Sequence, residues 1–219
     1  LLGSTDLDSY HKVFPELKGK ESPALIFARG VANIAITGSG TINGQGAHQN
    51  FQHGNDSKGG PRRPKIIYFI GCNNVRVQDV TLRNSAYWTQ DYEKCNGVIV
   101  RGVKVYSHAN WNNDGLDIDS RNVVVSDCYI DCDDDALCLK SDTDTPCENV
   151  TVTNCVLKSN CNAIKFGTSS YSGFKNVTIS NCTIDRASED HIRQWYKNYP
   201  WIGTKHKTVV AGIALESVD

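Results

Sequence analysis

A phrase that recurs six times constrains this chain more than any other feature. Each copy has an Asn or Gly, then aliphatic residues at alternate positions, then a second short alternating run. The first aliphatic residues stand at positions 34, 75, 98, 123, 150 and 177, so five copies follow one another at steps of 23 to 27 residues. Period-two runs rich in β-branched residues are typical of strands. A repeat this short cannot bury its apolar face alone, so successive copies must stack.

Stacking such turns strand upon strand predicts an all-β chain that folds as a right-handed parallel β-helix, because strand twist sets the hand of the crossovers. The aliphatic positions should then form columns along the stack, and one column is expected to hold Val75, Val98, Val123, Val150 and Val177. Leucine-rich repeats have a similar period, but their Leu-x-x-Leu-x-Leu spacing is missing here. Residues 1–219 are therefore predicted to be one solenoid domain.

Composition excludes several classes. Hydrophobic residues make up 39% and charged residues 21%, which is a globular balance. The net charge of −1 offers no bulk attraction for nucleic acid. The longest apolar run is five residues, 66–70, so no membrane insertion is expected. Three features lead us to interpret the sequence as a fragment of a longer protein. It contains no methionine, it does not open with a signal-peptide pattern, and its last residues resemble an interrupted strand.

The repeat also organises the cysteines and asparagines. Cys128, Cys155 and Cys182 are 27 residues apart and should share a column. Nine cysteines leave at least one thiol unpaired, and buried, mostly reduced thiols are expected. The sequence has no CxxC pair and no His at the spacing of metal ligands, so a zinc site is not indicated. The residues Asn122, Asn149 and Asn176 predict a stacked amide ladder at a turn, and glycosylation is a secondary interpretation.

An acidic cluster carries the candidate chemistry. Three successive turns begin their second strand with a polar residue followed by a small one, at 114–120, 135–141 and 162–168. In register, Asp114, Asp135 and Asn162 form one column, with Asp134 beside them. Crowded carboxylates repel one another, so at least one pKa should rise. One raised and one ordinary carboxylate is the combination that glycoside hydrolysis requires.

Asp residues at turns also have ordinary structural roles, because they cap their own backbone. Such a role is assigned to Asp117, Asp127 and Asp131. Asp119 is expected to pair with Lys140 on the next turn.

At this point a resemblance becomes specific. The stretch 112–117 (Asn-Asn-Asp-Gly-Leu-Asp) resembles the Asn-Thr-Asp-Gly motif of glycoside hydrolase family 28, the polygalacturonase and rhamnogalacturonan hydrolase family. The stretch 134–141 resembles its Asp-Asp motif, and 38–46 is similar to its glycine-rich early turn. The resemblance runs from about Leu25 to Thr183, and the chain is identified as a bacterial-type member.

The resemblance implies an inverting hydrolase of pectin-type polysaccharide, without a cofactor or metal. Asp134 would be the general acid, Asp114 and Asp135 would hold and activate water, and Asn112 would orient the site. The resemblance further implies a monomer that is extracellular or periplasmic and takes part in pectin degradation and cell wall organization. Its partner would be the polysaccharide.

Two departures from the family bear on substrate. Asn162 stands where the His of the Gly-His-Gly motif is expected. Ala214 and Glu216 stand where the Arg-Ile-Lys motif supplies two cations to a galacturonate carboxylate. Lys165 is either a substitute cation or the partner of an acid such as Asp117. The sequence thus predicts slow cleavage of plain polygalacturonate and a preference for a mixed pectic glycan or a neutral sugar at the cleaved bond.

Further candidate sugar-binding residues are Arg193 and Lys197, in a segment at 190–201 rich in aromatic and cationic residues, and Trp88, which follows Tyr87 and is expected to form a cleft wall. The alternative to sugar binding for the segment 190–201 is that its aromatic residues form a plug over the side of the β-helix. His108 is interpreted as structural.

Two other functions remain open from sequence. One is a polysaccharide lyase on the same fold, whose Asp cluster would bind Ca²⁺ while a Lys or Arg abstracts a proton. The other is a β-helix module that binds glycan without cleaving it.

Overall fold

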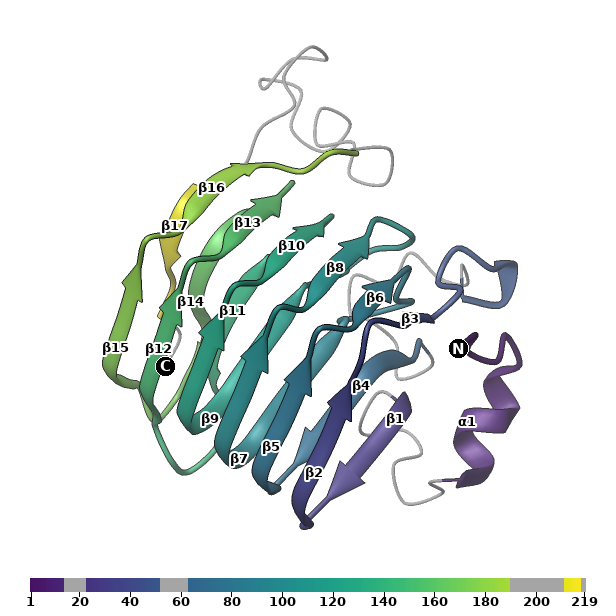
Figure 1. Cartoon of the computed structure of the whole chain (residues 1–219), viewed down its shortest axis with the longest axis horizontal. Coiled ribbons are helices and arrows are strands. Elements are labelled where there is room, and N and C mark those ends of the chain that lie inside the picture. Colours follow the sequence, from purple (N-terminus) through teal and green to yellow (C-terminus); the bar gives the residue numbers. More distant parts are fainter. Residues whose placement is uncertain (14–22, 52–62, 190–210, 218–219) are drawn as a thin grey trace.

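A computed structural model describes residues 1–13, 23–51, 63–189 and 211–217. The chain is a right-handed parallel β-helix, as the repeat predicts. Figure 1 shows the strands lying side by side in chain order along the stack, with the helix α1 (Leu7–Val13) at the N-terminal end. No described helix has the length and hydropathy that crossing a membrane requires.

Each turn of chain contributes strands to three faces. The first face holds β1 (Ala24–Arg29), β4 (Lys65–Ile70), the first parts of β7 (Gln90–Arg101) and β9 (Leu116–Ser126), β11 (Leu137–Ser141), β14 (Asn162–Ser170) and β17 (Ala211–Leu215). The second face holds the later parts of β7 and β9 with β2 (Ala32–Thr37), β5 (Asn73–Gln78), β12 (Cys147–Thr153) and β15 (Phe174–Ser180). The third face holds β3 (Thr41–Asn43), β6 (Thr81–Arg83), β8 (Lys104–Ser107), β10 (Tyr129–Cys132), β13 (Val156–Ser159) and β16 (Thr183–Arg186).

The register confirms the predicted aliphatic column. On the second face Val75 pairs with Val98, Val98 with Val123, Val123 with Val150 and Val150 with Val177. The first four of these side chains are at most 1% exposed. Apolar columns of this kind from all three faces fill one continuous core. Each described strand pairs in parallel with a strand of the neighbouring turn, so the apolar face of a turn is buried by stacking on the next turn.

The amide ladder is also present, at the bend between the first and second faces. Asn149 Nδ2 donates to Asn122 Oδ1 at 3.0 Å, and Asn176 Nδ2 donates to Asn149 Oδ1 at 3.0 Å. These three asparagines have φ angles of 53° to 57°, in the left-handed region that Asn tolerates better than most residues. Gly97, with φ 73°, occupies the equivalent place one turn before Asn122. The asparagines therefore make the sharp bend and bond successive turns together.

The cysteines follow the repeat as well. Cys128, Cys155 and Cys182 directly precede the paired residues Tyr129, Val156 and Thr183, so they form the expected column. Seven of the nine cysteines are buried, and these seven are free thiols.

Candidate active site

The predicted polar column lies where the strands of the first face begin. Leu116 pairs with Leu137, and Leu137 pairs with Ile164. Two residues before each of these lie Asp114, Asp135 and Asn162, so the three occupy successive positions of one column. Backbone bonds continue the pairing into the turn, since Gly115 N donates to Asp135 O at 2.8 Å and Ala136 N donates to Asn162 O at 2.9 Å.

A glycine permits this close stacking. A Cβ on Gly115 would lie 2.3 Å from Ile130 Cγ2 and 2.7 Å from Ala136 O. Both contacts are far inside van der Waals range, so any larger residue would push the turn of Asp114 away from the turn of Asp135. The small residue in the Asp114-Gly115 sequence is thus a requirement of packing.

The three carboxylates gather in one buried cluster. Asp114 is 4% exposed, Asp134 7% and Asp135 3%. Asp134 Oδ1 accepts the backbone N–H of Asp135 at 3.1 Å. The pKa of Asp114 is raised well above its ordinary value, first by burial and then by the charges of Asp117, Asp134 and Asp135. The rise that crowding predicts therefore falls on Asp114.

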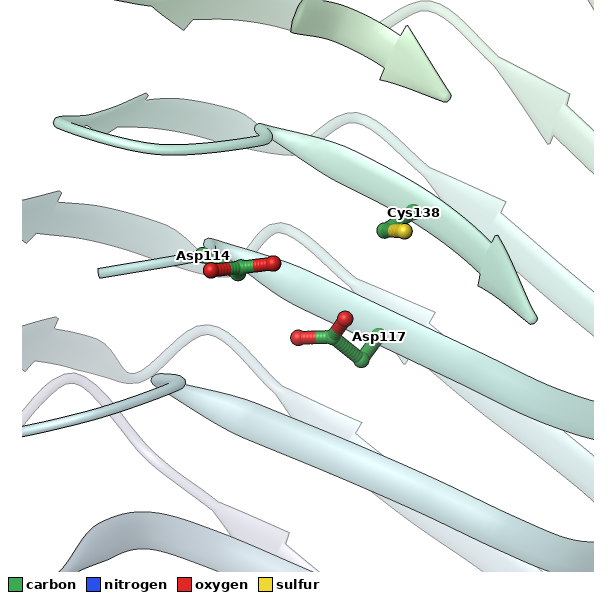
Figure 2. A group of neighbouring side chains, drawn as sticks. All are labelled: Asp114, Asp117 and Cys138. Carbon is green, nitrogen blue, oxygen red and sulfur yellow. The ribbon is translucent and has the colours of Figure 1, made fainter. Parts of the chain in front are cut away.

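Asp117, to which the sequence assigned a structural role, belongs to the same cluster. Its side chain is fully buried and lies on the same side of β9 as the carboxylate of Asp114, with Cys138 on the neighbouring strand β11 (Figure 2). Burial raises the pKa of Asp117 to about 7, while the Lys140 ammonium opposes the rise. The assignment was wrong because it ignored alternation: Leu116 and Ile118 point into the core, so Asp117 must face the cluster.

Asp135 differs from Asp114 in its partners. Its Oδ1 accepts hydrogen bonds from Asn162 N at 3.2 Å and from Asn162 Nδ2 at 2.7 Å. Its Oδ2 lies 3.3 Å from Lys165 Nζ. Hydrogen bonds and a cation both favour the ionised form of a carboxylate. The two stacked carboxylates therefore have unequal surroundings: Asp135 has an amide and an ammonium group as partners, and Asp114 lies among like charges.

The structure corrects two expected ion pairs. Lys140 Nζ lies 3.4 Å from Asp117 Oδ1, whereas Asp119 was expected to be its partner. Asp119 Oδ2 instead accepts the backbone N–H of Asp142 at 2.9 Å. Lys165 was considered for Asp117, but its ammonium bridges Asp135 and Glu216, at 3.3 Å from each carboxylate.

Trp88 occupies the first-face column one turn before Asp114. Its ring stacks on Tyr87, with centroids 5.1 Å apart and planes 11° apart. The ammonium groups of Lys65 and Lys140 each lie 4.5 Å from the ring centroid of Trp88. Both aromatic side chains are half-buried. This places the predicted wall residue next to the cluster, with two cations fixed against its ring.

Two further residues shape the turn that carries Asp114, and the sequence did not single them out. Asn113 Oδ1 accepts the backbone N–H groups of Ala109 and Asn110, both at 2.9 Å, while its Nδ2 donates to backbone carbonyls of the turn before. Arg63 Nη2 donates to Asn112 Oδ1 at 3.0 Å. Asn112 itself has φ 54°. The asparagine pair before Asp114 could have indicated a fixed turn, but Arg63 comes from a distant segment with no sequence signal.

The remaining predictions have separate outcomes. His108 is structural, as expected, since its Nε2 lies 3.0 Å from Asp131 Oδ1 in a buried pair. Hydrogen bonding to His108 and to Ser188 lowers the pKa of Asp131, although burial acts in the opposite direction. Arg193 and Lys197 lie outside the described residues.

Comparison with known proteins agrees with this geometry. The family model described as "Glycosyl hydrolases family 28" matches residues 11–194. A probable polygalacturonase of Vitis vinifera is 31% identical over 157 residues, which is 66% of this chain and 31% of that protein. The chain thus spans about a third of the length of this curated relative.

Two solved bacterial structures share the architecture. The exopolygalacturonase of Thermotoga maritima has a TM-score of 0.64 and 25% identity, over 75% of this chain and 48% of that one. The family 28 exopolygalacturonase of Yersinia enterocolitica has a TM-score of 0.67 and 22% identity, over 84% of this chain and 42% of that one.

Proposed function

Since the chain belongs to glycosyl hydrolase family 28, which the match over residues 11–194 shows, we propose that it is a glycosidase that cleaves a pectin-type glycan with inversion at the anomeric carbon. The observation that carries the proposal is the unequal surroundings of two stacked carboxylates. Asp135 accepts hydrogen bonds from Asn162 and lies beside the Lys165 ammonium group, whereas Asp114 is buried among like charges. An inverting glycosidase needs one carboxylate that accepts a proton and another that donates one.

The proposed roles are those that the resemblance to family 28 implies, and the raised pKa falls on the carboxyl group proposed to hold the water, Asp114. Asp134 is the general acid that protonates the leaving oxygen. Asp135 is the base that takes a proton from water, and Asp114 holds that water. Asn112, fixed by Arg63, and Asn162 orient these groups. Trp88 forms part of the wall of the sugar site beside the cluster, where Tyr87 and two ammonium groups hold its ring.

The proposed substrate is a pectic glycan with a neutral sugar at the cleaved bond. Support comes from the position where the family resemblance implied a cation: Ala214 pairs there with Lys165 across β14 and β17. Lys165, which is in register with Ala214, is already shared by Asp135 and Glu216. A uronate carboxylate would have to compete with both for the same ammonium group, and an unpaired buried charge costs several kcal/mol.

Broader expectations belong to the same proposal. We infer a single solenoid domain of a bacterial-type enzyme, acting as a monomer on cell-wall polysaccharide outside the cytoplasm. The matched sequence relative is from a plant, so the bacterial-type assignment stays a prediction.

The test is an oligosaccharide panel with homogalacturonan, xylogalacturonan and rhamnogalacturonan fragments, read by reducing ends and by mass. Wild type should release reducing ends without the ultraviolet absorbance of an unsaturated sugar, which a lyase would produce. Asp134→Asn should lose nearly all turnover, at least about 100-fold, while its thermal transition stays that of wild type. Glycan binding without release of reducing ends would contradict the proposal.

A further inference from the structure

A second feature of the acidic cluster involves Asp114 together with two residues that have no proposed role in glycan hydrolysis. Asp114, Asp117 and Cys138 each offer one ligand atom, and these three atoms lie within 4.8 Å of one another. The three residues come from two neighbouring strands of the first face, or from the turn just before it (Figure 2). All three are buried, at 4%, 0% and 0% exposure.

The carboxylates of this trio are short of partners. Asp114 Oδ1 and both oxygens of Asp117 are buried and accept no hydrogen bond from the described residues. Lys140 Nζ lies 3.4 Å from Asp117 Oδ1, an ion pair without hydrogen-bond geometry. Buried carboxylate oxygens normally accept hydrogen bonds or bind a cation, because leaving them bare costs free energy. Buried oxygens of this kind on two neighbouring carboxylates, beside the Cys138 thiol, would suit a positively charged ligand.

Charge also favours a dication at this place. Three lysines each pair with one carboxylate: Lys65 with Asp91, Lys140 with Asp117 and Lys165 with Asp135. An ionised Asp114 would add a negative charge that no ammonium group within the described ranges contacts. A deprotonated Cys138 would add a second negative charge. One divalent ion would neutralise both.

From these observations we infer that Asp114, Asp117 and Cys138 form a binding site for a thiophilic divalent ion of the Zn²⁺ and Cd²⁺ class. A thiolate ligand selects Zn²⁺ over the hard ions Mg²⁺ and Ca²⁺, which prefer oxygen alone. Ligand atoms around tetrahedral Zn²⁺ stand roughly 3.2–3.8 Å apart, so the side chains close by about 1 Å on binding. The Cys138 thiol, which now donates to Gly167 O at 3.1 Å, and any proton on the two carboxylates leave for solvent as the ion binds.

The chain contains its own matched control. Asp134, Asp135 and Cys161 form a second trio with ligand atoms within 4.8 Å. In that trio Asp135 is already bonded to Asn162 and Lys165, and Cys161 Sγ accepts Asn162 Nδ2 at 3.4 Å. The second trio has the same ligand types, but its atoms are engaged.

The experiment uses the reduced, chelator-treated chain, titrated with Zn²⁺ by calorimetry and with Cd²⁺ while the ultraviolet band of a cadmium–thiolate bond is recorded. We expect one ion per chain and a Cd–S band in wild type and in Cys161→Ser. Cys138→Ser keeps a hydrogen-bond donor for Gly167 O but removes the thiolate ligand. Loss of a residue that only orients a ligand lowers metal affinity about 10–100-fold, so this variant should lose at least that much affinity for Zn²⁺. Asp117→Asn, which has the same shape, should lower it as well.

Three results would overturn the inference: no Cd–S band in wild type, wild-type affinity in Cys138→Ser, or loss of binding in Cys161→Ser. Thermal transitions of each variant establish that it is folded; if Cys138→Ser does not fold, the wild-type band and Asp117→Asn decide. No glycan enters this measurement, so its failure is separate from failure of the proposed function. Where both hold, Zn²⁺ also blocks turnover, because it occupies Asp114.

Discussion

The ammonium group of Lys165 lies 3.3 Å from Oδ2 of Asp135, so a residue from one turn of the helix forms an ion pair with a carboxylate on the turn before. Burial alone would lower the pKa of Lys165, but Asp135, Cys138 and Glu216 together raise it above its ordinary value. The ammonium is therefore permanently charged. Because it bridges Asp135 and Glu216, the carboxylate of an acidic sugar would have to compete with both for it.

Lys165→Ala should weaken the proposed base. Without the ammonium group, Asp135 loses the cation that lies 3.3 Å from its Oδ2, so the rate of reducing-end release should fall. The measurement is the initial rate of reducing-end release on rhamnogalacturonan-type fragments and on homogalacturonan. Lys175→Ala removes an ion pair with Glu148 on the second face and is the control. Fast cleavage of homogalacturonan, undiminished in Lys165→Ala, would show that the substrate proposal is wrong.

Asp119 should make stability fall as pH rises. Burial raises its pKa to about 7, above the value of about 4 in an unfolded chain. The folded state therefore binds the proton more tightly, and the stability that the protonated carboxyl contributes at pH 4 is lost as pH rises through 7. Asp119→Asn keeps an acceptor for Asp142 N and should be more stable than wild type by ~1–2 kcal/mol at pH 8, with little difference at pH 4. Thermal melts across this range test it; the same gain in the exposed Asp185→Asn would count against it.

Asn149 tests the ladder. Asn149→Ala removes the hydrogen bonds to Asn122 and Asn176. It also places at φ 57° a residue that tolerates the left-handed region less well than Asn, so the free energy of unfolding should fall by about 1–2 kcal/mol. Asn149→Gly loses the same bonds but adopts the angle freely, as Gly97 does, and should cost less. A melting temperature about 2–4 °C lower per kcal/mol is the readout. Equal losses for the two variants would mean that backbone conformation has no share in the effect.

Gly115 tests how closely the carboxylates must stack. Gly115→Ala forces a Cβ against Ile130 and Ala136 O, an overpacking that costs about 1–3 kcal/mol. Activity should fall further than stability explains, because the turn of Asp114 moves relative to Asp135. The matched control is Gly40→Ala, where a Cβ meets nothing within 4 Å. Turnover of Gly115→Ala equal to that of Gly40→Ala would contradict the requirement for this stacking.

The repeat made the fold and the polar column predictable. Once a period-two run is placed in register, Asp114, Asp135 and Asn162 align because each stands two residues before a core aliphatic. The ion pairs were not predictable in the same way. Lys140 is in register with Asp119, but its long side chain reaches diagonally to the fully buried Asp117. Lys165 and Asp117 share a column with Cys138 between them, so two strand spacings of about 4.8 Å separate them.

The nine cysteines make the folded and the unfolded chain respond differently to oxidation. Seven are buried in the stack, where oxidants and other thiols reach them only when the chain opens. Unfolding in oxidising surroundings would expose all of them together, and disulfides formed between positions that are distant in the native stack would prevent refolding. How long the protein survives there is then governed by its rate of unfolding, and a large equilibrium stability would not by itself protect it.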